Sequence, residues 1–370
     1  MTVSSEELLD QLTEKLDENS SLKPIGPQEA IERFLRAKKE EIRDKTVTEY
    51  RRKLEHFERF CGKNGVCNLN NLDRRALDDY YEYRKYDSIS GSDVLATKTM
   101  RDEMYLLRDF IHYLETIDGV RKGLSNQIRV PSLEGDDGVR DIDLESERIE
   151  NILEYVERYE YASRKHVVWL SHVHNGCRPG DLYSLDLCDL HLQEEDPYIQ
   201  FKHRPRETGL KNDKKGEREA YLCDSVAEVF TDYINENRIE ITTENGRETF
   251  LTSTHGRLSR TTMRKYVYKY SRPCSVDGEC PHDRTPSTFE AAQSADTASR
   301  CPSSVPPYAL RHGYLSNRLN LEVPIEIVGE RCDVSPDVIK KHYDERSESQ
   351  KRKICRQVFQ EAAGDRGGYQ

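Results

Sequence analysis

The sequence predicts a mainly α-helical protein with a small antiparallel β-sheet (an α+β fold), divided into a helical amino-terminal domain and a larger mixed domain. The chain has 370 residues and a mass of 43.1 kDa, more than one ordinary hydrophobic core supports, so two domains are expected. Apolar residues recur at the three- and four-residue spacing of amphipathic helices. Two short β-rich stretches in the second half indicate a hairpin.

The amino-terminal domain is predicted to be helical throughout. Residues 1–26 contain a short helix at 6–18 and a polar tether. Residues 27–118 then hold four amphipathic helices and no strand pattern, which predicts a compact helical domain. The apolar stripes of the first two helices contain Ala30, Phe34, Leu35, Tyr50, Leu54, Phe57 and Phe60.

A linker and a larger domain are predicted to follow. Residues 119–143 are rich in glycine, proline and acidic residues, which is typical of a linker. The larger domain, 144–362, begins with two helices and continues with strands at 198–202 and 219–222 that flank a long polar tip. Its later helices are expected at 225–237, 261–270, 309–319, 324–328 and 335–343. A polar, cysteine-bearing insert (271–307) interrupts them, and residues 363–370 form a flexible tail.

Composition and charge restrict the class of protein. No run of about 18 apolar residues occurs, and the acidic amino terminus has no apolar signal core, so we expect no membrane partner and a cytoplasmic, nucleoid-associated protein. Acidic residues exceed basic ones by 68 to 57, which argues against simple electrostatic coating of nucleic acid but leaves a local DNA-binding face open. An acidic chain with 36 Arg and only 21 Lys has the composition expected of a protein that works in concentrated salt.

Three motifs occur in order along the larger domain. The first follows an apolar helix and consists of Gly176, Arg178, Asp181, Leu182, Leu185 and Asp189. The second is Leu310-Arg311-His312, and the third runs from Val334-Ser335 to His342-Tyr343. The predicted hairpin lies between the first motif and the second.

On these motifs the sequence resembles the tyrosine recombinase, or phage-type integrase, family. The resemblance covers roughly 27–356, and the helical domain looks like the SAM-like core-binding domain of that family. The acidic bias and the cysteine-rich insert look most like its haloarchaeal branch. The resemblance implies a site-specific recombinase that cleaves and rejoins double-stranded DNA through a 3'-phosphotyrosine, without a catalytic cofactor. It also implies a tetramer acting on two DNA sites.

The chemistry suits the residues that match the family motifs. Arg178 and Arg311 are the candidates for clamping the phosphate, because arginine forks stay protonated and match its oxygens. Tyr343 is the candidate nucleophile, and His312 would support it or the phosphate. A hairpin lysine would protonate the leaving 5' oxygen; Lys211 matches best by order, with Lys214 and Lys215 as alternatives.

Two departures from the family pattern leave a second function open. The first position of the middle motif, normally His or Lys, is Tyr308, a poor general base with an ordinary pKa of about 10. The His or Trp expected about nine residues before the nucleophile falls at Val334, by family spacing. The alternative is therefore a catalytically degenerate DNA-binding regulator or accessory protein of the same fold.

Two further sets of residues are predicted to bind ligands. The expected phosphate contacts, whose alternative is an ordinary charged surface, are Arg51, Arg52, Lys53, Arg257, Arg260, Arg264 and Lys265. A structural zinc ion is expected at Cys274, Cys280, His282 and Cys301, because the insert has little apolar content to order it. The alternative is a mobile loop with reduced thiols.

Overall fold

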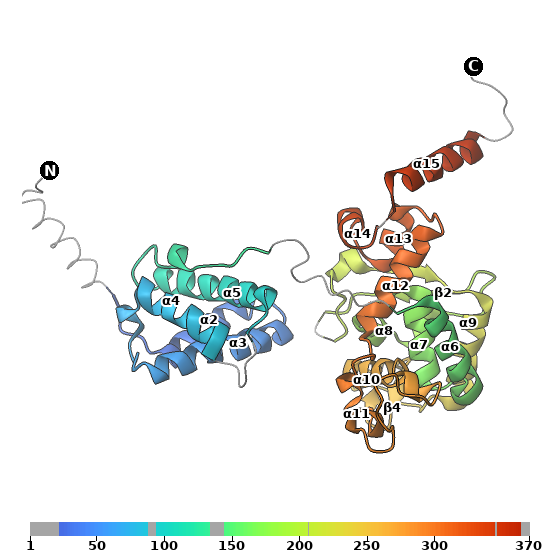
Figure 1. Ribbon diagram of the computed structural model, residues 1–370, viewed down its shortest axis with the longest axis horizontal. Helices are drawn as coiled ribbons and strands as arrows, with labels where there is room; N and C mark the ends of the chain where they lie inside the picture. The colour runs from blue at the N-terminus through green and yellow to red at the C-terminus, as the bar shows by residue number, and fades with distance from the viewer. Residues whose placement is uncertain (1–21, 88–93, 134–143, 206, 345, 364–370) are drawn as a thin grey trace, which may run out of the picture. The chain divides into compact units, whose positions relative to one another are not determined.

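The computed structural model describes residues 22–87, 94–133, 144–205, 207–344 and 346–363. The chain divides into two compact units, Met1–Arg140 and Asp141–Gln370 (Figure 1). Within the described ranges, no helix combines the length and the apolar character needed to span a bilayer. The helix predicted at 6–18 and the end of the predicted linker, 134–143, lie outside the described residues.

The first unit contains the four predicted helices. They are α2 (Pro27–Lys38), α3 (Asp44–Lys63), α4 (Arg74–Glu82) and α5 (Thr97–Thr116). Asp73 caps α4 by accepting a hydrogen bond from the backbone N of Ala76 at 2.8 Å, as expected for an Asp at this position. Aromatic side chains from three helices fill the core, where the Phe57 ring lies edge-on to Tyr80 and Phe110 at 5.2 and 5.9 Å.

The start of the predicted linker belongs instead to this unit. Val120, Leu124 and Ile128 are buried in the same core as the four helices. The buried Glu115 carboxylate also accepts a hydrogen bond from the backbone N of Ser125 at 2.7 Å. The glycines at 119 and 123 therefore mark turns of a packed segment.

The second unit combines many helices with two small sheets. Its helices are α6 (Ser146–Glu160), α7 (Arg164–Asn175), α8 (Pro179–Ser184), α9 (Asp224–Asp232), α10 (Arg260–Tyr270), α11 (Glu290–Gln293), α12 (Pro307–Asn320), α13 (Ile325–Cys332), α14 (Pro336–His342) and α15 (Glu348–Ala363). Its strands are β1 (Leu190–His191), β2 (Tyr198–Phe201), β3 (Arg218–Tyr221), β4 (Thr252–Ser253) and β5 (Gly256–Arg257). Figure 1 shows α12 running from the α10 region to α13 and α14.

The predicted hairpin is confirmed, and it carries one additional strand. Strands β2 and β3 pair antiparallel, with Ile199 opposite Ala220 and Phe201 opposite Arg218. The short β1 joins the other edge of β2. Ile199, Phe201 and Ala220 are buried in the main core, so one face of the sheet packs on the helices.

Helix α7 is the centre of the main core. Trp169, Val167 and Val168 are fully buried, and the helix contacts α6, α10 and α12. A separate apolar cluster links α12, α13 and α14 and includes Tyr314, Val328 and Tyr343. Residues Glu348–Ala363, for which the sequence predicted no helix, form α15.

Gly176 ends α7 in the left-handed conformation that glycine adopts most readily. Its φ is +56°, and a Cβ built there would lie 2.3 Å from Cδ1 of Tyr314. The position is therefore fixed both by the left-handed turn and by the close approach of α12.

We predict that Gly176→Ala lowers the free energy of unfolding of the second unit by about 2–4 kcal/mol, because overpacking adds to backbone strain. Gly246→Ala is the matched control, since Gly246 also has a positive φ (+73°) but no atom within 4 Å of the added Cβ. It should lose only about 1 kcal/mol. Equal losses in denaturant titrations of the two variants would show that the contact with Tyr314 is unimportant.

Candidate active site

The candidate site is organised by the carboxyl-terminal end of α13. The last carbonyls of a helix have no partner within the helix and carry the negative end of its dipole, so cations are stabilised there. Three successive carbonyls at this end each accept a hydrogen bond from an arginine. The pairs are Arg218 Nε to Arg331 O (2.7 Å), Arg311 Nη2 to Cys332 O (2.6 Å) and Arg178 Nη2 to Asp333 O (2.6 Å). The three arginines come from β3, α12 and the start of α8.

Arg311 links the ends of two helices. Its side chain extends from α12, is buried, and also donates from Nη1 to Gly176 O at 2.6 Å. Burial, followed by the positive charge of Arg178, lowers the pKa of Arg311 from its ordinary value. The two predicted phosphate-binding arginines are therefore close enough to repel each other, an arrangement that an anion between them would relieve.

Arg178 is held in place from both sides. It is the N-cap residue of α8, and Asp181 Oδ2 accepts from its backbone N at 3.2 Å. The same oxygen accepts from Arg218 Nη2 at 2.8 Å, so Asp181 of the first motif joins α8 to β3. On the other side, Arg178 Nη1 lies 2.5 Å from Asp333 Oδ2.

Tyr343 follows α14 directly and is 5% exposed. Its hydroxyl lies 2.8 Å from that of Tyr308 on α12. Burial raises the pKa of Tyr343 well above its usual range, and the Tyr308 hydrogen bond adds to this, while Arg311 and Arg178 act in the opposite direction. Tyr308 and Arg311 lie one turn apart on α12, so the hydroxyl contact brings the predicted nucleophile to the helix that carries Arg311.

His312 completes the contribution of α12. Its ring centroid lies 4.9 Å from that of Tyr343, and Nε2 is 3.2 Å from His342 O. Nδ1 is buried without a hydrogen-bond partner. Tyr308, Arg311 and His312 have the i, i+3, i+4 spacing of one helical face, which explains why one short motif supplies three of the predicted residues.

The hairpin tip reaches the same site. Asn212 Nδ2 donates to Asp333 Oδ1 at 2.8 Å, which brings the loop between β2 and β3 beside Arg178. Lys211, Lys214 and Lys215 are all exposed on this loop. The geometry is consistent with a hairpin lysine near the phosphate position, and the choice among the three stays a prediction.

The position expected to hold His or Trp contributes no polar side chain. Val334 packs against the apolar cluster of α12, α13 and α14. The neighbouring Arg331 is used elsewhere, donating from Nε to Tyr314 Oη and from Nη2 to Tyr221 O, both at 2.7 Å. Arg331 therefore fastens α13 to β3 and α12.

The predicted phosphate contacts fall into two groups. Arg51, Arg52, Arg260 and Arg264 are exposed, with Arg52 paired to Glu49 at 3.1 Å. Lys53 is half-buried, and Lys265 forms an ion pair with Asp296. Arg257 is a correction, because its side chain is 9% exposed and donates to Tyr183 O, Leu185 O and Asp186 Oδ1.

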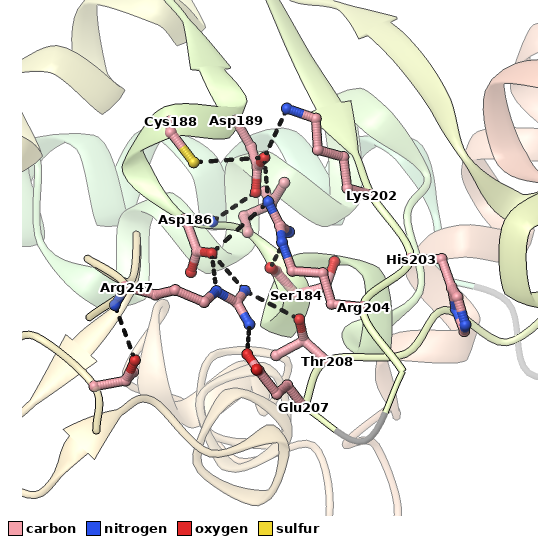
Figure 2. A network of polar contacts seen from close by, with 12 residues as sticks. Ser184, Asp186, Cys188, Asp189, Lys202, His203, Arg204, Glu207, Thr208 and Arg247 are labelled. Carbon is pink, nitrogen blue, oxygen red and sulfur yellow. Dashed lines mark hydrogen bonds and ion pairs between the residues drawn. The ribbon is translucent and has the colours of Figure 1, made fainter. Parts of the chain in front are cut away.

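Arg257 is joined through Asp186 to a buried polar network that the sequence did not reveal. Figure 2 shows Asp186 and Asp189 of this network facing Lys202, Arg204 and Arg247. Arg204 Nη2 lies 2.6 Å from Asp189 Oδ1, and Arg247 donates to Asp186. Burial by itself would raise the pKa of Asp189. The hydrogen bonds from Arg204 and the Asp186 backbone, together with the charges of Arg204 and Lys202, hold that pKa below its ordinary value. Among the described residues, Asp186, Cys188 and Asp189 are the one group with ligand atoms close enough to share a metal. Since cations already neutralise both carboxylates, the network is structural.

The four predicted zinc ligands do not gather in this way. Cys301 is buried, Cys274 and Cys280 are half-buried, and His282 Nε2 is hydrogen-bonded to Ser303 Oγ at 2.8 Å. The described ligand atoms of this set lie too far apart to form a metal group. Hydrogen bonds, the ion pair of Arg300 with Glu290 and the buried Ala291, Ala298 and Val305 hold the insert in the structure, and the zinc ion stays a prediction.

The comparisons with known proteins agree with this architecture. Residues 31–116 match the family model described as the phage integrase N-terminal SAM-like domain. The Tn1549 transposon integrase, solved in complex with transposon right end DNA, is similar over 91% of this chain and 100% of its own, with 12% identity and a TM-score of 0.63. A lambda integrase dimer bound to a COC' core site is similar over 91% of this chain and 82% of its own, with 14% identity and a TM-score of 0.59. The chain has the tyrosine recombinase fold.

The amino-terminal match also includes a haloarchaeal protein. The N-terminal domain of a phage integrase/site-specific recombinase from Haloarcula marismortui is 26% identical over 30% of this chain and 99% of its own, with a TM-score of 0.27. This overlap is too small to argue from, so the haloarchaeal resemblance stays a prediction. A comparison with curated proteins gives no match.

Proposed function

We propose that the protein is a site-specific DNA recombinase or integrase that cleaves and rejoins strands through a 3'-phosphotyrosine. The observation that carries the proposal is that Arg178 and Arg311 both bind carbonyls at the end of α13, while the Tyr343 hydroxyl, directly after α14, contacts Tyr308 one turn before Arg311 on α12. Two arginine forks beside one tyrosine suit attack on a phosphodiester, in which charge accumulates on the non-bridging oxygens.

In the proposed reaction, the Tyr343 oxygen attacks the phosphorus and loses its proton. The bond from phosphorus to the 5' oxygen breaks, and a hairpin lysine, with Lys211 favoured, protonates that oxygen to release a 5'-hydroxyl. Arg178 and Arg311 stabilise the charge on the phosphate throughout. Rejoining reverses these steps, because a 5'-hydroxyl attacks the phosphotyrosine, so the bond energy is conserved without ATP.

The Tyr343 proton is the difficult part of this reaction. The raised pKa keeps Tyr343 neutral near pH 7, so a base or nearby positive charge is needed to make it a nucleophile. Tyr308 is the group in contact, and the neutral hydroxyl of a tyrosine is a poor proton acceptor. We therefore propose a slow enzyme whose rate rises with pH.

The competing function is a DNA-binding regulator or accessory protein that does not cut. Two observations favour it: Val334 supplies no polar group, and Asp333 already occupies Arg178. Retention of both arginines and Tyr343 in one site favours the enzyme. We further propose, from the resemblance alone, that the active form is a tetramer on two DNA sites, acting on DNA in the cytoplasm at high salt.

Covalent trapping separates the two functions. Nicked suicide duplexes made from DNA flanking the gene should give a protein–DNA adduct that survives denaturant with the wild type, and none with Tyr343→Phe. Tyr86→Phe is a control that removes an exposed tyrosine elsewhere in the chain. A gel shift of the DNA without an adduct would support the DNA-binding regulator. An adduct that persists in Tyr343→Phe would show that a different residue is the nucleophile.

Replacing Tyr308 tests the proposed difficulty. We expect Tyr308→His to speed adduct formation at pH 7–8 by roughly 10- to 100-fold, because imidazole is a far better base at that pH. The wild-type rate should rise with pH up to about 9, because Tyr343 has a raised pKa and must lose its proton to attack. The rate of the His variant should depend on pH less steeply. Tyr308→Phe is the control, because it keeps the aromatic ring and removes only the hydroxyl group. A His variant no faster than the Phe variant would show that proton transfer does not limit cleavage.

We also propose a structural zinc ion in the insert, supported by three cysteines and one histidine in a segment of little regular structure. Binding would require Cys274, Cys280, His282 and Cys301 to move together. Mass-spectrometric metal analysis of the purified protein should then give about one zinc per chain, lost in Cys280→Ser and kept in Cys223→Ser. Metal-free protein that unfolds at the same temperature with and without added zinc would exclude the site.

A further inference from the structure

A carboxylate of the chain itself is bound to the guanidinium group that would bind the DNA phosphate. Asp333 Oδ2 lies 2.5 Å from Arg178 Nη1, and the carbonyl of the same residue accepts from Nη2 at 2.6 Å. Asp333 thus contacts both terminal nitrogens of Arg178. This is the end of the fork that would bind a phosphate in bidentate fashion.

Asp333 is the one carboxylate of the described residues that pairs with the proposed phosphate clamp, which consists of Arg178 and Arg311. Among the residues that the structure describes, no other Asp or Glu lies within ion-pair distance of Arg178 or Arg311. The second arginine is bound by neutral backbone carbonyls alone, at Gly176 and Cys332. The clamp therefore carries one compensating negative charge, and it comes from the turn that leads to Tyr343.

The surroundings of Asp333 hold its carboxylate against Arg178. The Asp333 side chain is 8% exposed, and its other oxygen accepts from Asn212 of the hairpin tip at 2.8 Å. Gly216, at the end of the same tip, packs so closely that an added Cβ would lie 3.3 Å from Oδ2. The backbone of Asp333 has a φ of +53°, a conformation that glycine and asparagine adopt more readily. Neither of those residues would supply the negative charge.

We propose that Asp333 is a positioning residue that acts as an anionic placeholder in the cleavage site. Its carboxylate fills the anion position of Arg178, keeps the arginine and the hairpin tip in place, and is displaced when a DNA phosphate enters. This inference rests on the proposed function, because it takes Arg178 to be a phosphate ligand.

Displacement follows from electrostatics. A phosphate and a carboxylate on the same guanidinium repel each other, and like charges brought together at an interface weaken binding. DNA binding must therefore break the contact between Arg178 and Asp333. The same event frees the turn between α13 and α14 and so couples phosphate binding to the position of Tyr343.

Asp333→Asn tests the placeholder directly. Asparagine suits the left-handed backbone, and its amide oxygen still accepts hydrogen bonds, so the variant should fold; thermal unfolding checks this. Glu330→Gln is the matched control, because it removes one negative charge from the exposed surface of the same helix, α13. We expect Asp333→Asn to bind a duplex about tenfold more tightly than Glu330→Gln at equal salt, which corresponds to the repulsion removed.

A second variant shows whether the effect passes through Arg178. In an Arg178→Gln background, Asp333→Asn should change DNA affinity no more than Glu330→Gln does. Equal affinities of Asp333→Asn and Glu330→Gln in the wild-type background, weaker binding by Asp333→Asn, or an equally large gain without Arg178 would each overturn the placeholder. Adduct formation is scored separately, so tighter binding without any adduct would reject the recombinase while leaving the placeholder intact.

Discussion

Arginine binding at the carboxyl-terminal end of α13 determines how the rest of the candidate site is arranged. Three successive carbonyls of this helix end accept from guanidinium groups on β3, α12 and α8, so elements far apart in sequence meet at one point. The unpaired carbonyls of a helix end attract cations, and arginine can serve two acceptors at once, as Arg311 does by also binding Gly176 O. The helix end is stabilised, and the arginines are held in fixed positions.

This arrangement places a cluster of arginines in an acidic protein. Net charge of −11 would repel DNA at long range, but the charges near Tyr343 are positive and held in place. Burial favours the neutral form of Tyr343, whereas the positive charges of the two arginines favour its anion. Asp333 balances the arginines while no DNA is bound, and a phosphate would replace it.

Much of the fold and part of the site were predictable from the sequence. Periodicity gave the main helices and the β2–β3 hairpin, because these elements bury a regular stripe or face. Short elements such as α8 and β1 were missed, since a few residues carry too little pattern.

Arg178, Arg311 and Tyr343 were found through their motifs. Arg218, Asn212 and Asp333 were not, because their roles depend on contacts across more than 100 residues of chain. Sequence does not show burial, so it could not reveal that the Arg257 guanidinium is bound to Asp186 and to two backbone carbonyls.

The most direct test of this account is the structure of the Tyr343→Phe protein bound to its DNA site. The account predicts that Arg178 and Arg311 both hydrogen-bond the non-bridging oxygens of one phosphate, with residue 343 beside it. It also predicts that the Asp333 carboxylate has left Arg178. A complex in which Arg178 still contacts Asp333, while the DNA phosphates bind only to other residues, would contradict the account.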